Sequence, residues 1–292
     1  MIGDEQQRFF RDQGYLVVQD VFSATELADM RAALARLIED ARTVTEHGEI
    51  YDLEPAHTAD NPRVRRIKQP QKVDEAFARA LKNPNLLGIL QRLVGPNIVL
   101  RGGKLNIKAA RGGSPVEWHQ DWAFYPSTND DLLAVGIYLE DGTPDNGPLL
   151  VVPGSHRGPT LDHHAHGYFV GAVSPETLGT LPDQAVALTG PAGACTFHHV
   201  RTLHGSAQNT SAQDRPLLLF EVLAADAFGL TQMTSWADRQ AALLCGELTI
   251  VPRFAPCPIR MPYPPPPREG SIYEVQAAGA ARTFAFDDRM AG

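Results

Sequence analysis

The first hundred residues carry mostly the apolar spacing of helices. Ser23 and Glu26 fit a capping box, in which each side chain binds the other's backbone N–H at a helix start. Apolar residues then recur every three or four positions, which indicates an amphipathic helix. Helices are expected over 4–12, 24–42 and 74–94, with one strand over 15–18.

From residue 98 onward, short apolar or alternating runs are separated by clusters of Gly, Pro, Asn and Asp. Many short strands with turn signals between them are typical of a β-sandwich or jelly roll. Strands are expected over 98–109, 132–140, 149–153, 184–189, 194–199 and 216–224, and a helix near 236–245. We therefore predict one domain over 1–292, divided into mostly helical support (1–97), a β core (98–225) and a variable C-terminal segment (226–292).

Composition narrows the class of protein. The chain has 292 residues, of which 43% are hydrophobic and 21% charged, as in ordinary globular proteins. A net charge of −8 and the lack of a long basic run argue against a nucleic-acid partner, and no apolar run suggests a membrane partner. Three cysteines without a signal-peptide pattern suggest reduced thiols, so a cytoplasmic location is expected.

Candidate metal ligands begin with His119 and Asp121. If 116–122 is extended, both side chains point to the same face, because strand side chains alternate. One imidazole and one carboxylate are two of the three ligands of a facial triad, which leaves other positions on Fe(II) open. The third ligand must come from a distant strand. His204 is well placed, although His198 and His199 also satisfy the spacing.

Arg215 favours His204 among these histidines. It follows His204 at the start of an apolar run, where its guanidinium could clamp the distal carboxylate of a dicarboxylate co-substrate. Ser206 could add a hydroxyl hydrogen bond to the same carboxylate. A second histidine cluster lies in a long connection, and a metal role is less favoured for it: His163, His164 and His166.

These motifs together resemble the phytanoyl-CoA dioxygenase family of Fe(II)- and 2-oxoglutarate-dependent enzymes. The resemblance covers roughly residues 5–225 and implies a mainly β protein with flanking helices, whose core is a double-stranded β-helix (a cupin-like jelly roll). It is carried by Trp118-His119-Gln120-Asp121, Asp145-Asn146-Gly147-Pro148-Leu149, Val152-Pro153-Gly154-Ser155-His156-Arg157-Gly158, and His204-Gly205-Ser206 with Asn209 and Arg215-Pro216.

The resemblance also implies roles for individual residues. Iron would be held by His119, Asp121 and His204, and 2-oxoglutarate by Arg215 and Ser206. Further co-substrate contacts are expected from residues that match the family less closely: Asn106 and Lys108, which alternate onto one face of the preceding strand, and Lys68.

The function implied is hydroxylation of an unactivated carbon in a small-molecule metabolite or natural-product intermediate, with O₂ as co-substrate and ascorbate as reductant in vitro. Trp122, Phe124 and Tyr125 follow the first two ligands and either line the substrate pocket or pack in the core. The same iron chemistry could instead end in desaturation, epoxidation or rearrangement. A non-catalytic, cupin-like metal-binding protein is a further alternative, against which Arg215 and Ser206 argue.

Overall fold

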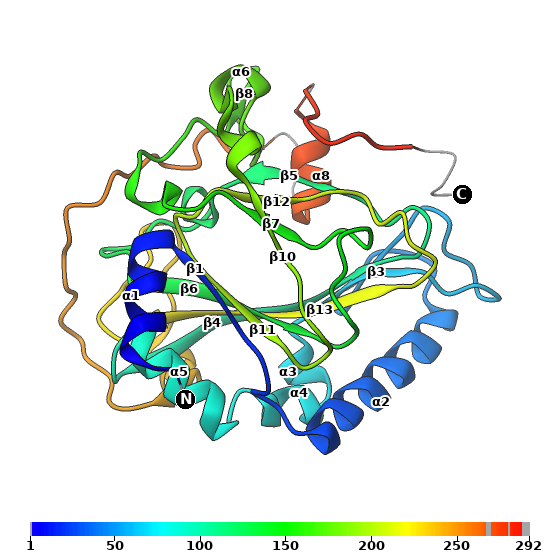
Figure 1. The fold of residues 1–292 in the computed structure, drawn as a ribbon, viewed down its shortest axis with the longest axis horizontal. Helices are drawn as coiled ribbons and strands as arrows, with labels where there is room; N and C mark the ends of the chain where they lie inside the picture. The colour runs from blue at the N-terminus through cyan, green and yellow to red at the C-terminus, as the bar shows by residue number, and fades with distance from the viewer. Residues whose placement is uncertain (1, 267–269, 280, 288–292) are drawn as a thin grey trace.

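Side chains alternate along the central strands, and two antiparallel sheets lie face to face (Figure 1). The computed structural model describes residues 2–266, 270–279 and 281–287. The larger sheet has eight strands, ordered β1 (Tyr15–Val18), β11 (Cys195–His199), β6 (Leu132–Tyr138), β13 (Arg215–Ala224), β4 (Ile98–Lys108), β3 (Val64–Lys68) and β2 (Tyr51–Leu53), with β14 (Leu243–Cys245) also paired to β4. The smaller sheet has four, ordered β10 (Val186–Leu188), β7 (Leu149–Val151), β12 (His204–Ser206) and β5 (Val116–His119). This is the jelly-roll, or double-stranded β-helix, architecture.

The helices between residues 24 and 93 cover the outer face of the larger sheet. In Figure 1 they lie below it, whereas the smaller sheet and the helices at 175–178 and 272–277 lie above. The helices are α1 (Asp4–Gln13), α2 (Ala24–Asp40), α3 (Pro70–Val73), α4 (Glu75–Ala80) and α5 (Pro84–Leu93), with α6 (Pro175–Leu178), α7 (Trp236–Ala241) and α8 (Ile272–Ala277) later in the chain. Among the described residues there are also four 3-10 turns: η1 (Ala41–Thr43), η2 (Asp121–Ala123), η3 (Ser155–Arg157) and η4 (Leu181–Gln184). A separate two-stranded ribbon pairs β8 (His164–Ala165) with β9 (Tyr168–Phe169).

Strand β13 shows how the two faces of the larger sheet differ. Leu218, Phe220 and Val222 join the main hydrophobic core under the helices. The alternate residues Arg215, Leu217 and Leu219 face the smaller sheet, where they line a cavity. Period-two alternation therefore supplies the core and the inner cavity from one buried strand.

The predicted elements are largely confirmed. The short elements α3, α6, α8, β8 and β9 were not predicted, and three further differences lie in the larger sheet or beside the candidate ligands. Strands β2 and β3 were not expected, because β3 carries Arg65, Arg66 and Lys68 and lacks a clear apolar alternation. The helix expected near 236–245 ends at Ala241, and 243–245 is a strand added to β4.

The third difference lies beside the candidate ligands. The extended run expected over 116–122 ends at His119, and Asp121 begins the turn η2. In this turn the backbone N–H of Trp122 donates to the Val200 carbonyl at 2.9 Å. The indole of Trp122 then packs in a hydrophobic cluster.

Within the described ranges, no helix combines the length and apolar character that a bilayer span requires.

Candidate metal centre

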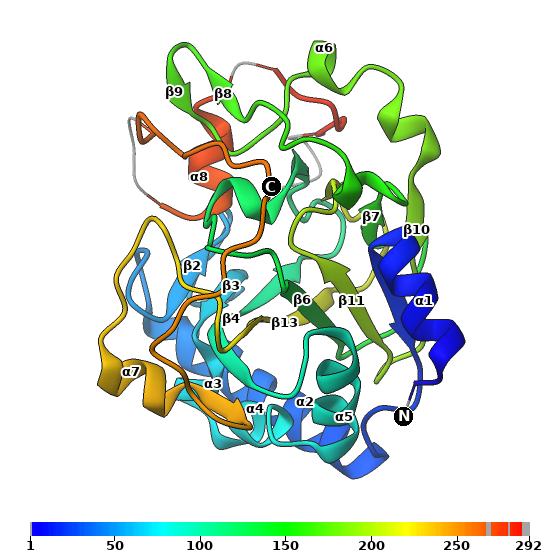
Figure 2. The ribbon, with the colours of Figure 1, turned by 90° about the vertical axis from the view of Figure 1, so that its left-hand side faces the viewer.

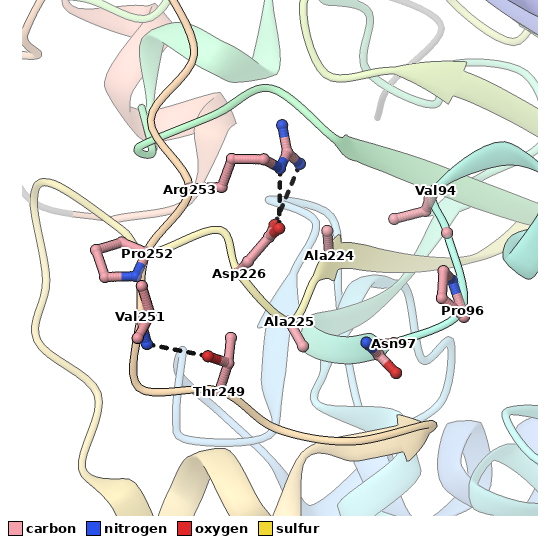
Figure 3. Close-up of a pocket in the computed structure, with 11 residues that line it drawn as sticks. Val94, Pro96, Asn97, Ala224, Ala225, Asp226, Thr249, Val251, Pro252 and Arg253 are labelled. Carbon is pink, nitrogen blue, oxygen red and sulfur yellow. Dashed lines mark hydrogen bonds and ion pairs between the residues drawn. The ribbon is translucent and has the colours of Figure 1, made fainter.

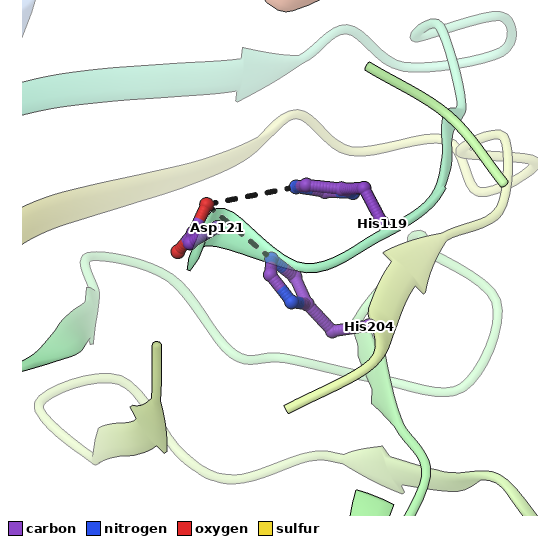
Figure 4. A group of neighbouring side chains, drawn as sticks. All are labelled: His119, Asp121 and His204. Carbon is purple, nitrogen blue, oxygen red and sulfur yellow. Dashed lines mark ion pairs between the residues drawn. The ribbon is translucent and has the colours of Figure 1, made fainter. Parts of the chain in front are cut away.

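Pairing of β5 with β12 brings two candidate ligands together. His119 and His204 are direct register partners in this antiparallel pair, and their ring centroids lie 4.1 Å apart. Asp121 lies two residues after His119, at the start of η2. Its Oδ1 is 3.7 Å from His119 Nε2 and 3.9 Å from His204 Nε2. Figure 4 shows the three side chains pointing toward one another. Their ligand-type atoms all lie within 4.8 Å of one another, so the group could hold one metal ion.

The surroundings of both imidazoles suit metal ligation. His119 Nδ1 lies 2.8 Å from the Glu117 carbonyl, and His204 Nδ1 lies 2.9 Å from the Thr202 carbonyl. A carbonyl can only accept, so each Nδ1 carries the proton and each Nε2 keeps a lone pair directed at the site. Burial lowers the pKa of His119 to about 4 and that of His204 well below its usual value. Both rings are therefore neutral near pH 7.

Asp121 is the carboxylate of the group. Burial alone would raise its pKa, but His204, His198 and Lys104 hold the pKa well below its ordinary value. The carboxylate is therefore ionised in the cavity. Two neutral imidazoles and one carboxylate are the donor set that non-haem Fe(II) oxygenases use.

The rival histidines occupy other places. His198 is buried on β11 with its Nε2 3.5 Å from Asp121 Oδ2, and neither ring nitrogen has a hydrogen-bond partner in the described part of the chain. His199 points elsewhere and accepts from the Arg201 N–H at 3.2 Å. Neither belongs to the group that could hold a metal, and the cluster at 163–166 forms no such group among the described residues.

A cavity of about 60 Å³ adjoins the three candidate ligands, between the two sheets. Arg215 lines it and is only 3% exposed. Its Nη2 donates to the Gly147 carbonyl at 2.6 Å, whereas its Nε and Nη1 find no hydrogen-bond partner within the described ranges. A buried guanidinium without an anionic partner is costly, so this corner of the cavity suits a carboxylate.

The other residues expected at the co-substrate site divide into two groups. Ser206, Asn106 and Lys108 line the same cavity as Arg215. The ammonium of Lys108 already donates to the carbonyls of Ser114 and Ala207, at 2.7 and 2.6 Å.

Lys68 lies outside this cavity lining. Its ammonium is 2.8 Å from both Asp52 Oδ1 and the Gly48 carbonyl. This arrangement does not support the assignment of Lys68 as a co-substrate contact.

The three aromatic residues after Asp121 also lie outside the cavity lining. Trp122 and Tyr125 belong to a hydrophobic cluster with Leu132 and Leu223, and the Trp122 indole N–H donates to the Pro258 carbonyl at 2.9 Å. Phe124 packs edge-on against His119, with ring centroids 5.8 Å apart. A substrate contact for Trp122, Phe124 or Tyr125 stays a prediction.

Sequence reasoning missed two features of the cavity wall. Lys104 shares its face of β4 with Asn106 and Lys108, and the same alternation could have indicated it. It pairs with Glu221 at 2.9 Å, and Arg101 binds the other oxygen of Glu221 at 2.6 Å. Tyr273, on α8, had no local signal at all, since no motif marks the C-terminal segment.

A larger hollow of about 380 Å³ lies at the surface, away from these residues (Figure 3). Its lining comes from residues 94–97, 224–226, 249 and 251–253. Its charged side chains, Arg253 and Asp226, pair with each other at 2.8 Å. With no unpaired charge and no metal-type group in its lining, this hollow is not the candidate site.

Comparisons with known proteins agree with this chemistry. The family model for phytanoyl-CoA dioxygenase matches residues 10–217. The chain is 36% identical over 278 residues to a probable alpha-ketoglutarate-dependent hypophosphite dioxygenase of Stutzerimonas stutzeri, covering 94% of this chain and 97% of that protein. It is 31% identical over 238 residues to an L-proline trans-4-hydroxylase of Streptomyces griseoviridis, covering 74% and 84%.

Solved structures of EctD from S. alaskensis have the same fold. The form with bound Fe has a TM-score of 0.69 at 25% identity, covering 85% of this chain and 88% of that one. The form with 2-oxoglutarate and 5-hydroxyectoine has a TM-score of 0.67 at 25% identity, covering 89% and 87%.

Proposed function

Because the chain belongs to the phytanoyl-CoA dioxygenase family and is an Fe(II)- and 2-oxoglutarate-dependent dioxygenase, we propose that His119, Asp121 and His204 hold its iron. When bound, Fe(II) supplies the oxidising chemistry that converts substrate, O₂ and 2-oxoglutarate into hydroxylated substrate, succinate and CO₂. The residues on this chain orient the reactants. The two backbone carbonyls that fix the imidazole tautomers keep both Nε2 lone pairs directed inward.

The 2-oxoglutarate role of Arg215 rests on one observation. Its guanidinium is buried in the cavity beside the candidate ligands, and two of its nitrogens lack partners among the described residues. We propose that the distal carboxylate of 2-oxoglutarate accepts from these nitrogens, with Ser206 and Asn106 beside it. A non-catalytic metal site would have no use for such a cation.

Anaerobic titration of the Fe(II)-loaded protein with 2-oxoglutarate tests this role. Arg215→Gln removes the charge and keeps a polar side chain, and the loss of one partner of a buried charged pair costs about 2–5 kcal/mol. The dissociation constant for 2-oxoglutarate should therefore rise roughly 30-fold or more. Arg215→Lys should recover only part of the affinity, because an ammonium lacks the two-pronged geometry.

Iron affinity should stay near the wild-type value in both variants. Arg8→Ala, at an exposed arginine far from the site in sequence, is the control and should leave both affinities unchanged. Unchanged 2-oxoglutarate affinity in Arg215→Gln would place the clamp elsewhere.

For the substrate, we propose a small anion. The charged residues of the cavity lining are Lys104, Lys108, Arg215 and Asp121, and burial holds the pKa of Lys108 well below its usual value. Glu221 pairs with Lys104 and Arg101, so three cations, Arg101, Lys104 and Arg215, stand against the carboxylates of Asp121 and Glu221. The charges of Fe(II) and of 2-oxoglutarate cancel, so the filled site keeps an excess of positive charge. The relative described as a hypophosphite dioxygenase, similar over 94% of this chain, makes hypophosphite the first candidate. The oxidised bond would then be P–H rather than the C–H bond that the motifs led us to expect, and phosphite should form in step with succinate.

A further inference from the structure

Tyr273 reaches the co-substrate cavity from the far end of the chain. It lies on α8, well beyond residue 217, where the family match ends, yet it lines the same cavity as Arg215 and Ser206. Figure 1 shows α8 next to β5. No motif of the sequence accounts for a side chain at this place.

Helix α8 is held against both sheets. Toward the smaller sheet, Gln276 accepts from the Glu117 N–H at 3.0 Å, and its amide donates to the carbonyls of Glu117 and Gly171 at 3.3 and 2.9 Å. Toward the larger sheet, Glu274 forms an ion pair with Arg65 of β3. The helix therefore spans the gap between the sheets at the end of the cavity where Arg215 lies.

The ring of Tyr273 is fixed in orientation. The Arg65 guanidinium carbon lies 4.6 Å from the ring centroid, and that of Arg66 lies 5.7 Å away, both at cation–π distance. Within the described ranges, no hydrogen bond to the Tyr273 hydroxyl is found. Burial raises the pKa of this phenol, so the hydroxyl stays protonated near pH 7 and is available as a donor.

A carboxylate has more acceptor positions than one guanidinium can fill. We propose that Tyr273 donates its hydroxyl to the distal carboxylate of 2-oxoglutarate beside Arg215, and that α8 closes this end of the cavity once the co-substrate is bound. This inference rests on the proposed role of Arg215. It assigns the C-terminal segment a part in binding the co-substrate.

The test is Tyr273→Phe, which keeps the ring and its contacts with Arg65 and Arg66 and removes only the hydroxyl. Losing a hydrogen bond to a charged group should raise the dissociation constant for 2-oxoglutarate about tenfold or more in anaerobic titrations with Fe(II). Tyr263→Phe is the matched control, because Tyr263 lies in the same C-terminal segment and is 77% exposed. Its affinity should equal that of the wild type.

Hydrogen exchange gives a second readout, independent of turnover. Adding 2-oxoglutarate to the Fe(II)-loaded wild type should slow amide exchange over residues 271–278, and the slowing should be smaller in Tyr273→Phe at equal saturation. Wild-type affinity in Tyr273→Phe, with weak binding in Arg215→Gln, would overturn the role of Tyr273 and leave that of Arg215 standing. Absence of saturable 2-oxoglutarate binding to the wild type would overturn both.

Discussion

The backbone between two of the proposed ligands is held by a histidine that must stay neutral. Gln120 lies between His119 and Asp121, and its N–H donates to His163 Nε2 at 2.8 Å. The other ring nitrogen, Nδ1, lies 2.9 Å from the Leu161 carbonyl, so it carries the proton. A second proton on this ring would turn the Nε2 acceptor into a donor facing the Gln120 N–H. His163 thus holds the backbone between the two ligands only in its neutral form.

This dependence predicts acid sensitivity of the metal-free protein. Burial lowers the pKa of His163 to about 3, below the value of about 6.5 in an unfolded chain. Between these values the unfolded state binds the extra proton, so the stability from the buried neutral ring is full above about pH 6.5 and is lost as pH falls. One such histidine contributes a slope of at most about 1.4 kcal/mol per pH unit.

Urea unfolding at a series of pH values measures this slope. His163→Gln, which cannot take up the proton, should lose stability less steeply between about pH 6 and 4 than the wild type. His166→Gln, at an exposed histidine of the same connection, should follow the wild-type curve. Parallel curves for wild type and His163→Gln would show that another group controls the acid limb.

At the scale of elements, the connection from β6 to β7 positions Arg215. Gly147 has a φ of +69°, and its carbonyl accepts from Arg215. A Cβ there would lie 2.6 Å from the Ala207 carbonyl oxygen and 2.7 Å from Lys108 Cδ. Gly147→Ala should therefore destabilise the protein by about 1–3 kcal/mol from backbone strain alone. It should also weaken 2-oxoglutarate binding, because the carbonyl that orients Arg215 must move.

Gly167→Ala separates these two effects. Gly167 also has a positive φ, +80°, but no atom lies within 4 Å of its added Cβ. It should show the strain in a chemical unfolding experiment and keep wild-type 2-oxoglutarate affinity in a calorimetric titration. Equal affinities in the two variants would mean that the Gly147 carbonyl does not set the position of Arg215.

At the scale of the whole molecule, charge is distributed unevenly. The chain carries a net charge of −8, yet its inner cavity has more cationic than acidic side chains. This contrast predicts selection of small anions by the cavity itself. With Fe(II), 2-oxoglutarate, O₂ and ascorbate, hypophosphite should stimulate succinate release more than L-proline, a zwitterion.

Lys104→Met should raise the KM for the anion several-fold, because it removes the cation beside Asp121, whereas Lys82→Met, at an exposed lysine, should not. Phosphorus NMR of the product and a succinate assay together make the measurement. Stimulation by L-proline alone would refute the anion proposal and leave the iron and 2-oxoglutarate roles untouched.

Much of the fold could be predicted from local pattern alone. The continuous apolar runs of β6 and β13 predict buried strands, and the alternation in β4 predicts that Asn106 and Lys108 share one face. These features depend on neighbours within a few residues, since the side-chain direction in a strand repeats every second position. The motifs around His119 and His204 carried the chemistry in the same local way.

Tertiary structure decided which of these residues meet. The register of β5 against β12, rather than spacing, places His204 opposite His119 and leaves His199 pointing elsewhere. Lys68, on β3, forms an ion pair with Asp52. Helix α8 brings Tyr273 to the cavity from beyond the family motifs. Arg215 and the family resemblance pointed to His204, but local pattern could not decide these contacts. Each contact joins segments far apart in sequence, and strand register and packing choose among partners that local patterns leave equivalent.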